Sequence, residues 1–150
     1  MRCAEGTASC CAVPSRLRLA ADASRMRVYL AIAIGGIIGC WARYAMTVWL
    51  QSVYGRDFPY ATLAINVLGS FLMGFLFVLT LERATVEPYL RVGILTGVLG
   101  GFTTFSTYAM ETLLLAEGGE LGKGLLYVVL SNVLAISAAV VGAALARIAL

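Results

Sequence analysis

Four long apolar segments constrain this chain more than any other feature of its sequence. They cover roughly residues 28–50, 60–81, 89–116 and 121–148. A helix needs about 20 apolar residues to cross the hydrocarbon of a bilayer. Backbone groups inside lipid must be hydrogen-bonded internally, and runs this long and continuous achieve that as helices, not as barrel strands. The sequence therefore predicts an all-α integral membrane protein with four transmembrane helices.

The composition excludes several functional classes. Hydrophobic residues make up 61% of the chain and charged residues 13%, whereas soluble domains carry about 25% charged residues. The basic residues are scattered and form no patch interleaved with aromatic residues, so we expect no nucleic-acid partner. Histidine is absent, and neither a metal-binding cluster nor a pair of carboxylates is available. We therefore expect no enzymatic activity.

The N-terminal stretch differs from the rest of the chain. Residues 1–25 contain no apolar run and mix charged residues with Ser, Thr and Pro14. We expect residues 1–25 to form a disordered extension and residues 26–150 to form the four-helix domain. Met26 stands directly before the first apolar segment, so we expect it to be the initiator. The alternative is that residues 1–25 are a cytosolic tail.

The links between the apolar segments are short, so consecutive helices are expected to be antiparallel. They lie at residues 51–59, 82–88 and 117–119. An even number of spans puts both termini on one side of the membrane. Counted from Met26, the two sides differ weakly in basic residues, with Arg27, Arg83, Arg91 and Arg147 against Arg56 and Lys123. Because an excess of basic residues marks the cytoplasmic side, this weak bias permits insertion in both orientations. The basic extension of residues 1–25, if translated, favours its own retention in the cytoplasm.

Small residues recur at four-residue spacing in three of the spans. The sets are Gly35 and Gly39; Gly93, Gly97 and Gly101; and Ala138, Gly142 and Ala146. Such ridges let helix backbones approach closely within a membrane, so we expect them to mark helix contacts. Four helices alone enclose few interior positions, and an ionic path through the protein therefore requires a second subunit.

Ionisable, amide and hydroxyl side chains inside the spans are candidates for a functional site, because such groups are costly in lipid. They are Arg43; Asn66 and Ser70; Thr103, Thr104, Ser106, Thr107 and Glu111; and Tyr127, Ser131 and Asn132. Arg43 has two interpretations that the residues do not separate. Its guanidinium can snorkel to the nearer headgroups, or it can serve a function.

The third span has two interpretations as well. It contains the string Gly100-Gly101-Phe102-Thr103-Thr104-Phe105-Ser106-Thr107. Two glycines and four hydroxyls are typical of a broken helix, whose freed carbonyls can coordinate a cation such as Na⁺ where they line a polar cavity. In the alternative, an intact helix, the hydroxyls bond to carbonyls one turn earlier. Local composition alone narrowly favours the intact helix.

The polar groups share helix faces. Phe105, Tyr108 and Glu111 fall at i, i+3 and i+6, while Asn66 with Ser70, and Tyr127 with Ser131, fall at i and i+4. Amide and hydroxyl hydrogens and positive ring edges suit an anion better than a cation, since spans one, two and four hold no acidic residue. The alternative is that each group bonds a neighbouring helix.

Three motifs occur in order along the spans. The first span has Gly35-Gly36-Ile37-Ile38-Gly39 followed by Arg43-Tyr44. The second has Pro59, then Thr62-Leu63-Ala64-Ile65-Asn66-Val67-Leu68-Gly69-Ser70-Phe71 and Gly74. The third has the eight-residue string given above together with Glu111. In these motifs the chain, from Met26 to its end, resembles the CrcB/Fluc family of fluoride channels.

The resemblance implies a passive, fluoride-selective channel that exports cytoplasmic fluoride and lowers its toxicity. It places the chain as a multi-pass protein in the bacterial inner membrane, the plasma membrane. It also implies a third helix broken near its middle and a dual-topology homodimer, whose two antiparallel subunits line two narrow pores with a structural Na⁺ at the centre of their interface.

The resemblance also implies roles for individual residues. Pore roles fall on Arg43, Asn66, Phe105, Thr107, Tyr108, Glu111, Tyr127 and Ser131, and the backbone carbonyls of Gly100 and Thr103 would hold the Na⁺. Asn66 would supply an amide, and Phe105 and Tyr108 would present ring edges to fluoride. The family usually has Phe where this chain has Tyr108, whose hydroxyl can donate to the anion or alter throughput.

Two other functions compete with the channel. A small four-helix, dual-topology exporter of lipophilic cations would be expected to carry an acidic residue in its first span, where this chain has Arg43 and no Asp or Glu. A structural or assembly subunit would have no use for the four hydroxyls of the third span.

Overall fold

The computed structural model describes residues 15–82 and 86–149, and every element in these ranges is helical. The elements are α1 (Ser15–Tyr54), α2 (Tyr60–Glu82), α3 (Pro88–Val92), the π-helical η1 (Gly93–Leu99), α4 (Gly100–Phe102), α5 (Phe105–Glu117) and α6 (Leu121–Ile148). The third predicted span therefore comprises α3, η1, α4 and α5. The predicted all-helical architecture of four helices, the third of them interrupted, is confirmed.

Hydropathy sets three of the spans outright. Within the described residues, the helical stretches Asp22–Tyr54, Tyr60–Leu81 and Leu121–Ile148 are each long and apolar enough to cross a membrane. The third span does not qualify as one helix because it is divided into shorter pieces. The protein is thus a multi-pass membrane protein whose third span is interrupted.

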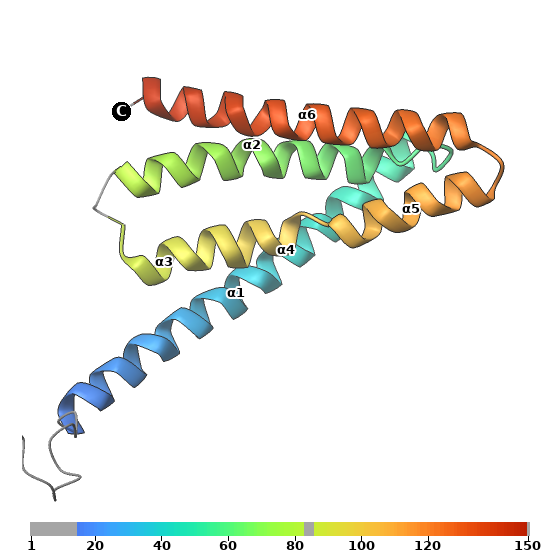
Figure 1. The fold of residues 1–150 in the computed structure, drawn as a ribbon. Helices are drawn as coiled ribbons and strands as arrows, with labels where there is room; N and C mark the ends of the chain where they lie inside the picture. Colours follow the sequence, from blue (N-terminus) through green and yellow to red (C-terminus); the bar gives the residue numbers. More distant parts are fainter. Residues whose placement is uncertain (1–14, 83–85, 150) are drawn as a thin grey trace, which may run out of the picture.

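The helices run alternately in opposite directions, as the short links predict (Figure 1). The start of α1 and the end of α6 lie at the same end of the molecule, and α1 runs obliquely across the others. Glycines with positive φ end two helices: Gly55 (φ 77°) follows α1, and Gly119 (φ 81°) lies in the turn after α5. Such backbone angles favour glycine because it has no Cβ.

Close backbone contacts hold the spans together in two pairs. Helix α2 packs along α6, and α1 packs against η1 and α4. A Cβ on Gly39 would collide with the carbonyl oxygen of Val98, and one on Gly142 would collide with that of Phe71. The expectation that the four-residue glycine spacings mark helix contacts is confirmed at these positions. Because apolar lipid supplies no hydrophobic drive between helices, this close packing contributes much of the association.

The helix break lies at Thr103 and Thr104, both of which have extended backbone angles. Asn66 of α2 clamps it: Nδ2 donates to the carbonyl of Thr104 at 3.0 Å, and Oδ1 accepts from the N–H of Thr104 at 2.9 Å. The hydroxyl of Thr104 then caps α5 by accepting from the N–H of Thr107 at 3.3 Å. The prediction of an intact helix, which local composition favours, is therefore wrong. The side chain of Asn66, distant in the sequence, replaces the helical hydrogen bonds that Thr104 lacks.

The first helix begins earlier than the sequence suggests. Residues 15–25 belong to α1, although we expected them to lie in an extension without regular structure. Their Leu, Ala and Arg residues are good helix formers, so a helix begun in the membrane can continue through them. Residues 1–14 lie outside the described part of the chain. The division at residue 26 and the assignment of Met26 as initiator stay predictions.

The glycine contacts generate a stability prediction. Gly39→Ala should destabilise the protein by about 1–3 kcal/mol, because the added Cβ forces α1 away from the carbonyl of Val98. Gly122→Ala is the matched control, since a Cβ on that helical glycine meets nothing within 4 Å. Thermal unfolding of the purified variants in detergent measures the difference. Equal melting temperatures for the two variants would contradict the packing argument.

Candidate functional site

A cavity of about 320 Å³ lies beside the helix break, between α2, α5 and α6, and we call it the mid-span cavity. Its lining residues are Asn66, Gly69, Ser70, Met73, Thr103, Phe105, Tyr108, Ser131, Asn132, Ala135, Ile136 and Ala139. The structure thus brings together four residues with predicted pore roles from three different spans: Asn66, Phe105, Tyr108 and Ser131. Their role in a pore is still a prediction.

The polar side chains of the mid-span cavity offer donors and no carboxylate. Asn66 uses one amide hydrogen and its oxygen on the backbone of Thr104, and no described residue accepts the second amide hydrogen. Ser131 is 7% exposed, and within the described ranges its hydroxyl is a buried side-chain group without a hydrogen-bond partner. A buried hydroxyl without a partner destabilises a fold. Such a group is free to donate a hydrogen bond to a ligand in the cavity.

Aromatic rings continue from the mid-span cavity toward the α1–α2 loop. The ring centroids of Phe105 and Tyr108 are 5.4 Å apart, and those of Tyr108 and Tyr127 are 5.2 Å apart. Tyr127 is completely buried, and its ring meets that of Phe58 edge-on at 5.6 Å. Phe105 is 77% exposed in the isolated chain. One wall of the mid-span cavity is therefore open to whatever covers this face.

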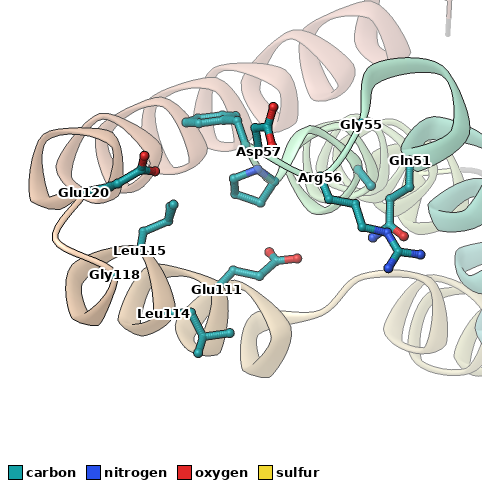
Figure 2. Close-up of a pocket in the computed structure, with 12 residues that line it drawn as sticks. Gln51, Gly55, Arg56, Asp57, Glu111, Leu114, Leu115, Gly118 and Glu120 are labelled. Carbon is teal, nitrogen blue, oxygen red and sulfur yellow. The ribbon is translucent and has the colours of Figure 1, made fainter.

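Glu111 closes the row of rings with a hydrogen-bonded carboxylate. The hydroxyl of Thr62 donates to Oε1 at 2.9 Å, and the hydroxyl of Tyr127 donates to Oε2 at 2.8 Å. Beyond Glu111 lies a second cavity of about 270 Å³, the mouth cavity, bounded by the loop from Gly55 to Pro59 and by α5. Figure 2 shows the Glu111 side chain extending from α5 toward that loop.

The two cavities and the groups between them form one polar row. It passes from the mid-span cavity along Tyr108 and Tyr127 to Glu111 and the mouth cavity. Hydroxyls, ring edges and amide groups of this kind can replace part of the hydration shell of a small anion. The donors of the mid-span cavity can therefore bind a small anion at membrane depth.

Two predicted pore residues lie elsewhere in the described part of the chain. The hydroxyl of Thr107 accepts from that of Thr104 at 3.0 Å, and Thr107 lines neither cavity. Arg43 lies on α1, where its guanidinium meets the thiol of Cys40 at 3.7 Å, and it also lines neither cavity. Within one subunit, these two side chains are separate from the polar row.

The break also frees carbonyls at the two positions predicted to hold a cation. In a continuous helix, the carbonyl of Gly100 would accept from the N–H of Thr104, and that of Thr103 from the N–H of Thr107. Here the N–H of Thr104 bonds to Asn66, and the N–H of Thr107 bonds to the side chain of Thr104. Both carbonyls thus lose their helical donors. Gly100 is exposed in the isolated chain, so a group outside this chain can reach it.

The structure gives roles to two side chains for which the sequence predicted none. Thr62 holds Glu111, and Asn132 donates to the hydroxyl of Tyr108 at 3.0 Å. Helical spacing gives a signal for Thr62, which falls one turn before Asn66 on the same face of α2. For Asn132 the sequence showed only a polar group at membrane depth, since its partner depends on how α5 packs against α6.

Comparison with known proteins identifies the family. A family model described as "CrcB-like protein, Camphor Resistance (CrcB)" matches residues 30–143. A protein of Acidithiobacillus ferrooxidans described as a fluoride-specific ion channel is 58% identical over 75% of this chain and 90% of its own length. A protein of the same description from Thermus thermophilus is 50% identical over 66% of this chain and 77% of its own length. The chain therefore belongs to the CrcB family, whose similar members named here are described as ion channels and not as enzymes.

Proposed function

We propose that this protein is a fluoride-selective passive channel of the bacterial plasma membrane, through which cytoplasmic fluoride leaves the cell. HF that enters from an acidic exterior dissociates inside, and the trapped anion then needs an exit. The observation that carries the proposal is the buried hydroxyl of Ser131, which has no hydrogen-bond partner among the described residues. It lies in a cavity whose described lining offers donors and ring edges and no carboxylate. Family membership and the relatives described as fluoride-specific ion channels support it.

In this proposal, fluoride exchanges hydration water for the donors of the polar row. Asn66 offers its free amide hydrogen, Ser131 its hydroxyl, and Phe105 and Tyr108 their ring edges. Tyr127 lines the track, and Glu111 stands near its end, where two hydroxyls hold its carboxylate away from the mid-span cavity. Within one subunit, neither Arg43 nor Thr107 reaches the polar row. Their proposed roles, Arg43 at the vestibule and Thr107 along the track, therefore apply to the assembled channel.

The channel is proposed to be an antiparallel, dual-topology homodimer. Phe105 is 77% exposed in the isolated chain, so the mid-span cavity needs a second wall. A second subunit in a two-fold arrangement would supply that wall and would receive the same in return, which gives two equivalent pores. The weak difference in basic residues between the two sides is compatible with insertion in both orientations.

A structural Na⁺ fits the freed carbonyls of Gly100 and Thr103. Unwound backbone carbonyls are typical ligands for Na⁺ within membrane proteins. Two carbonyls do not complete the oxygen shell of a cation, whereas the equivalent pair from a second subunit would add to it. When bound, the ion would offset the lost helical hydrogen bonds and link the subunits.

Fluoride efflux from liposomes tests the function and the role of Ser131. The wild-type protein should release fluoride rapidly, as measured with a fluoride electrode, and release little chloride in a parallel experiment. At fluoride concentrations well below half-saturation, Ser131→Ala should lower fluoride flux roughly tenfold, because the pore loses about 1.5 kcal/mol of affinity with one hydrogen bond to the anion. Its thermal stability should not fall, because no described residue bonds to this hydroxyl.

Ser137→Ala is the matched control on α6, because Ser137 is exposed and outside the mid-span cavity. This variant should conduct as the wild type does. Normal flux through Ser131→Ala would exclude the hydroxyl as a donor in the pore. Absence of fluoride flux through a folded wild-type dimer would refute the channel function.

A charge at residue 66 provides a second prediction. Asn66→Asp retains an acceptor for the N–H of Thr104 but places a carboxylate against the Thr104 carbonyl and in the mid-span cavity. The negative charge should abolish fluoride flux, to below one hundredth of the wild-type rate, as several kcal/mol of repulsion imply. Efflux by this variant at near wild-type rates would count against the assigned path.

Removal of Na⁺ tests the cation site. The purified protein should unfold at a temperature roughly 5–10 °C higher in NaCl than in choline chloride of equal ionic strength. This is the shift expected for a ligand that adds about 2–3 kcal/mol to the free energy of unfolding. KCl should resemble choline chloride. Identical melting temperatures in all three salts would contradict a structural Na⁺ while leaving the anion path in place.

A further inference from the structure

Asn132 is an amide whose orientation is set by two acceptors. Its Nδ2 donates to the carbonyl of Val128 on its own helix at 2.8 Å and to the hydroxyl oxygen of Tyr108 on α5 at 3.0 Å. One nitrogen therefore uses both of its hydrogens. The reversed amide would place Oδ1 against the carbonyl of Val128, where two acceptors would repel each other. The donor thus faces Tyr108.

Tyr108 is held at its ring as well as at its hydroxyl. Its ring lies between Phe105 and Tyr127, with centroid distances of 5.4 and 5.2 Å. The hydroxyl oxygen accepts from Asn132, and no described residue accepts the hydroxyl hydrogen. Because both residues line the mid-span cavity, that hydrogen is available to a ligand in the cavity.

We propose that Asn132 positions the Tyr108 hydroxyl as a hydrogen-bond donor to the permeating fluoride, and that this pair raises the affinity of the pore for fluoride. The proposal rests on the proposed channel function. A phenyl ring at residue 108 would offer fluoride only its weakly positive C–H edge. An O–H bonded to an anion forms a shorter and stronger hydrogen bond, and so replaces more of the hydration that fluoride loses.

The contribution of Asn132 follows from the freedom of a hydroxyl. An isolated phenolic O–H rotates to meet whichever acceptor is nearest. The amide of Asn132 donates to the Tyr108 hydroxyl oxygen from one side, so the hydroxyl hydrogen must point away from Asn132. Asn132 is therefore a positioning residue that acts through Tyr108, and removing it should have no effect on fluoride once the hydroxyl itself is gone.

The experiment measures fluoride efflux from liposomes over a range of fluoride concentrations for the full-length protein. Tyr108→Phe should raise the half-saturating fluoride concentration at least tenfold, since one hydrogen bond to an anion contributes that much affinity. The maximal rate should stay equal or rise, because a weaker site releases the ion sooner. Tyr29→Phe, which removes an exposed hydroxyl from α1, should change neither quantity.

A double-mutant cycle isolates the pair. Asn132→Leu should raise the half-saturating concentration roughly threefold to tenfold in the wild-type background and leave it unchanged in the Tyr108→Phe background. Ser137→Leu, on an exposed part of the same helix, controls for the apolar substitution. Melting temperatures and elution volumes of all variants establish that the folded assembly is compared.

Three results would overturn the proposal. The first is a half-saturating concentration that does not change in Tyr108→Phe. The second is an equal effect of Asn132→Leu in both backgrounds, which would indicate a role in packing alone. In either case a conducting wild type leaves the channel function intact. The third, a wild type that does not conduct fluoride, refutes the channel function and this inference together.

Discussion

The paired hydrogen bonds between Asn66 and the backbone of Thr104 are the interaction on which the rest of the structure depends. A break in a membrane helix leaves polar backbone groups that lipid cannot satisfy. The side chain of Asn66 satisfies the N–H and the carbonyl of Thr104 at once, at 2.9 and 3.0 Å. These two bonds stabilise an extended backbone at membrane depth. Helix α5 therefore begins anew after the break, capped by Thr104.

The site is a consequence of that geometry. Because α5 restarts after the break, Tyr108 meets Tyr127 of α6, and Phe105 lines the mid-span cavity together with Ser131. The same break withdraws the helical donors from the carbonyls of Gly100 and Thr103, which become free to accept other bonds.

Much of the fold and part of the site could be predicted from residues alone. Hydropathy and length predicted the four helical segments, short links predicted their alternation, and glycine spacing located the contacts of α1 with η1 and α4. The helix break could not be decided in this way, because Gly, Ser and Thr are compatible with an intact helix and with a broken one. Asn66, far away in the sequence, decides between them. The partners of Glu111 and Tyr108 were equally inaccessible, since they come from other helices.

The sequence by itself thus determined which segments enter the membrane and which side chains are costly there, since the free energy of transfer into lipid depends on composition over about 20 residues. Tertiary structure decided which polar groups meet. Thr62 and Tyr127 reach the carboxylate of Glu111, whereas no residue in the described part of the chain bonds to the hydroxyl of Ser131. Hydrogen bonds require donor and acceptor within about 3 Å and in line, a condition that depends on the relative positions of α2, α5 and α6 and that no local pattern along the chain contains.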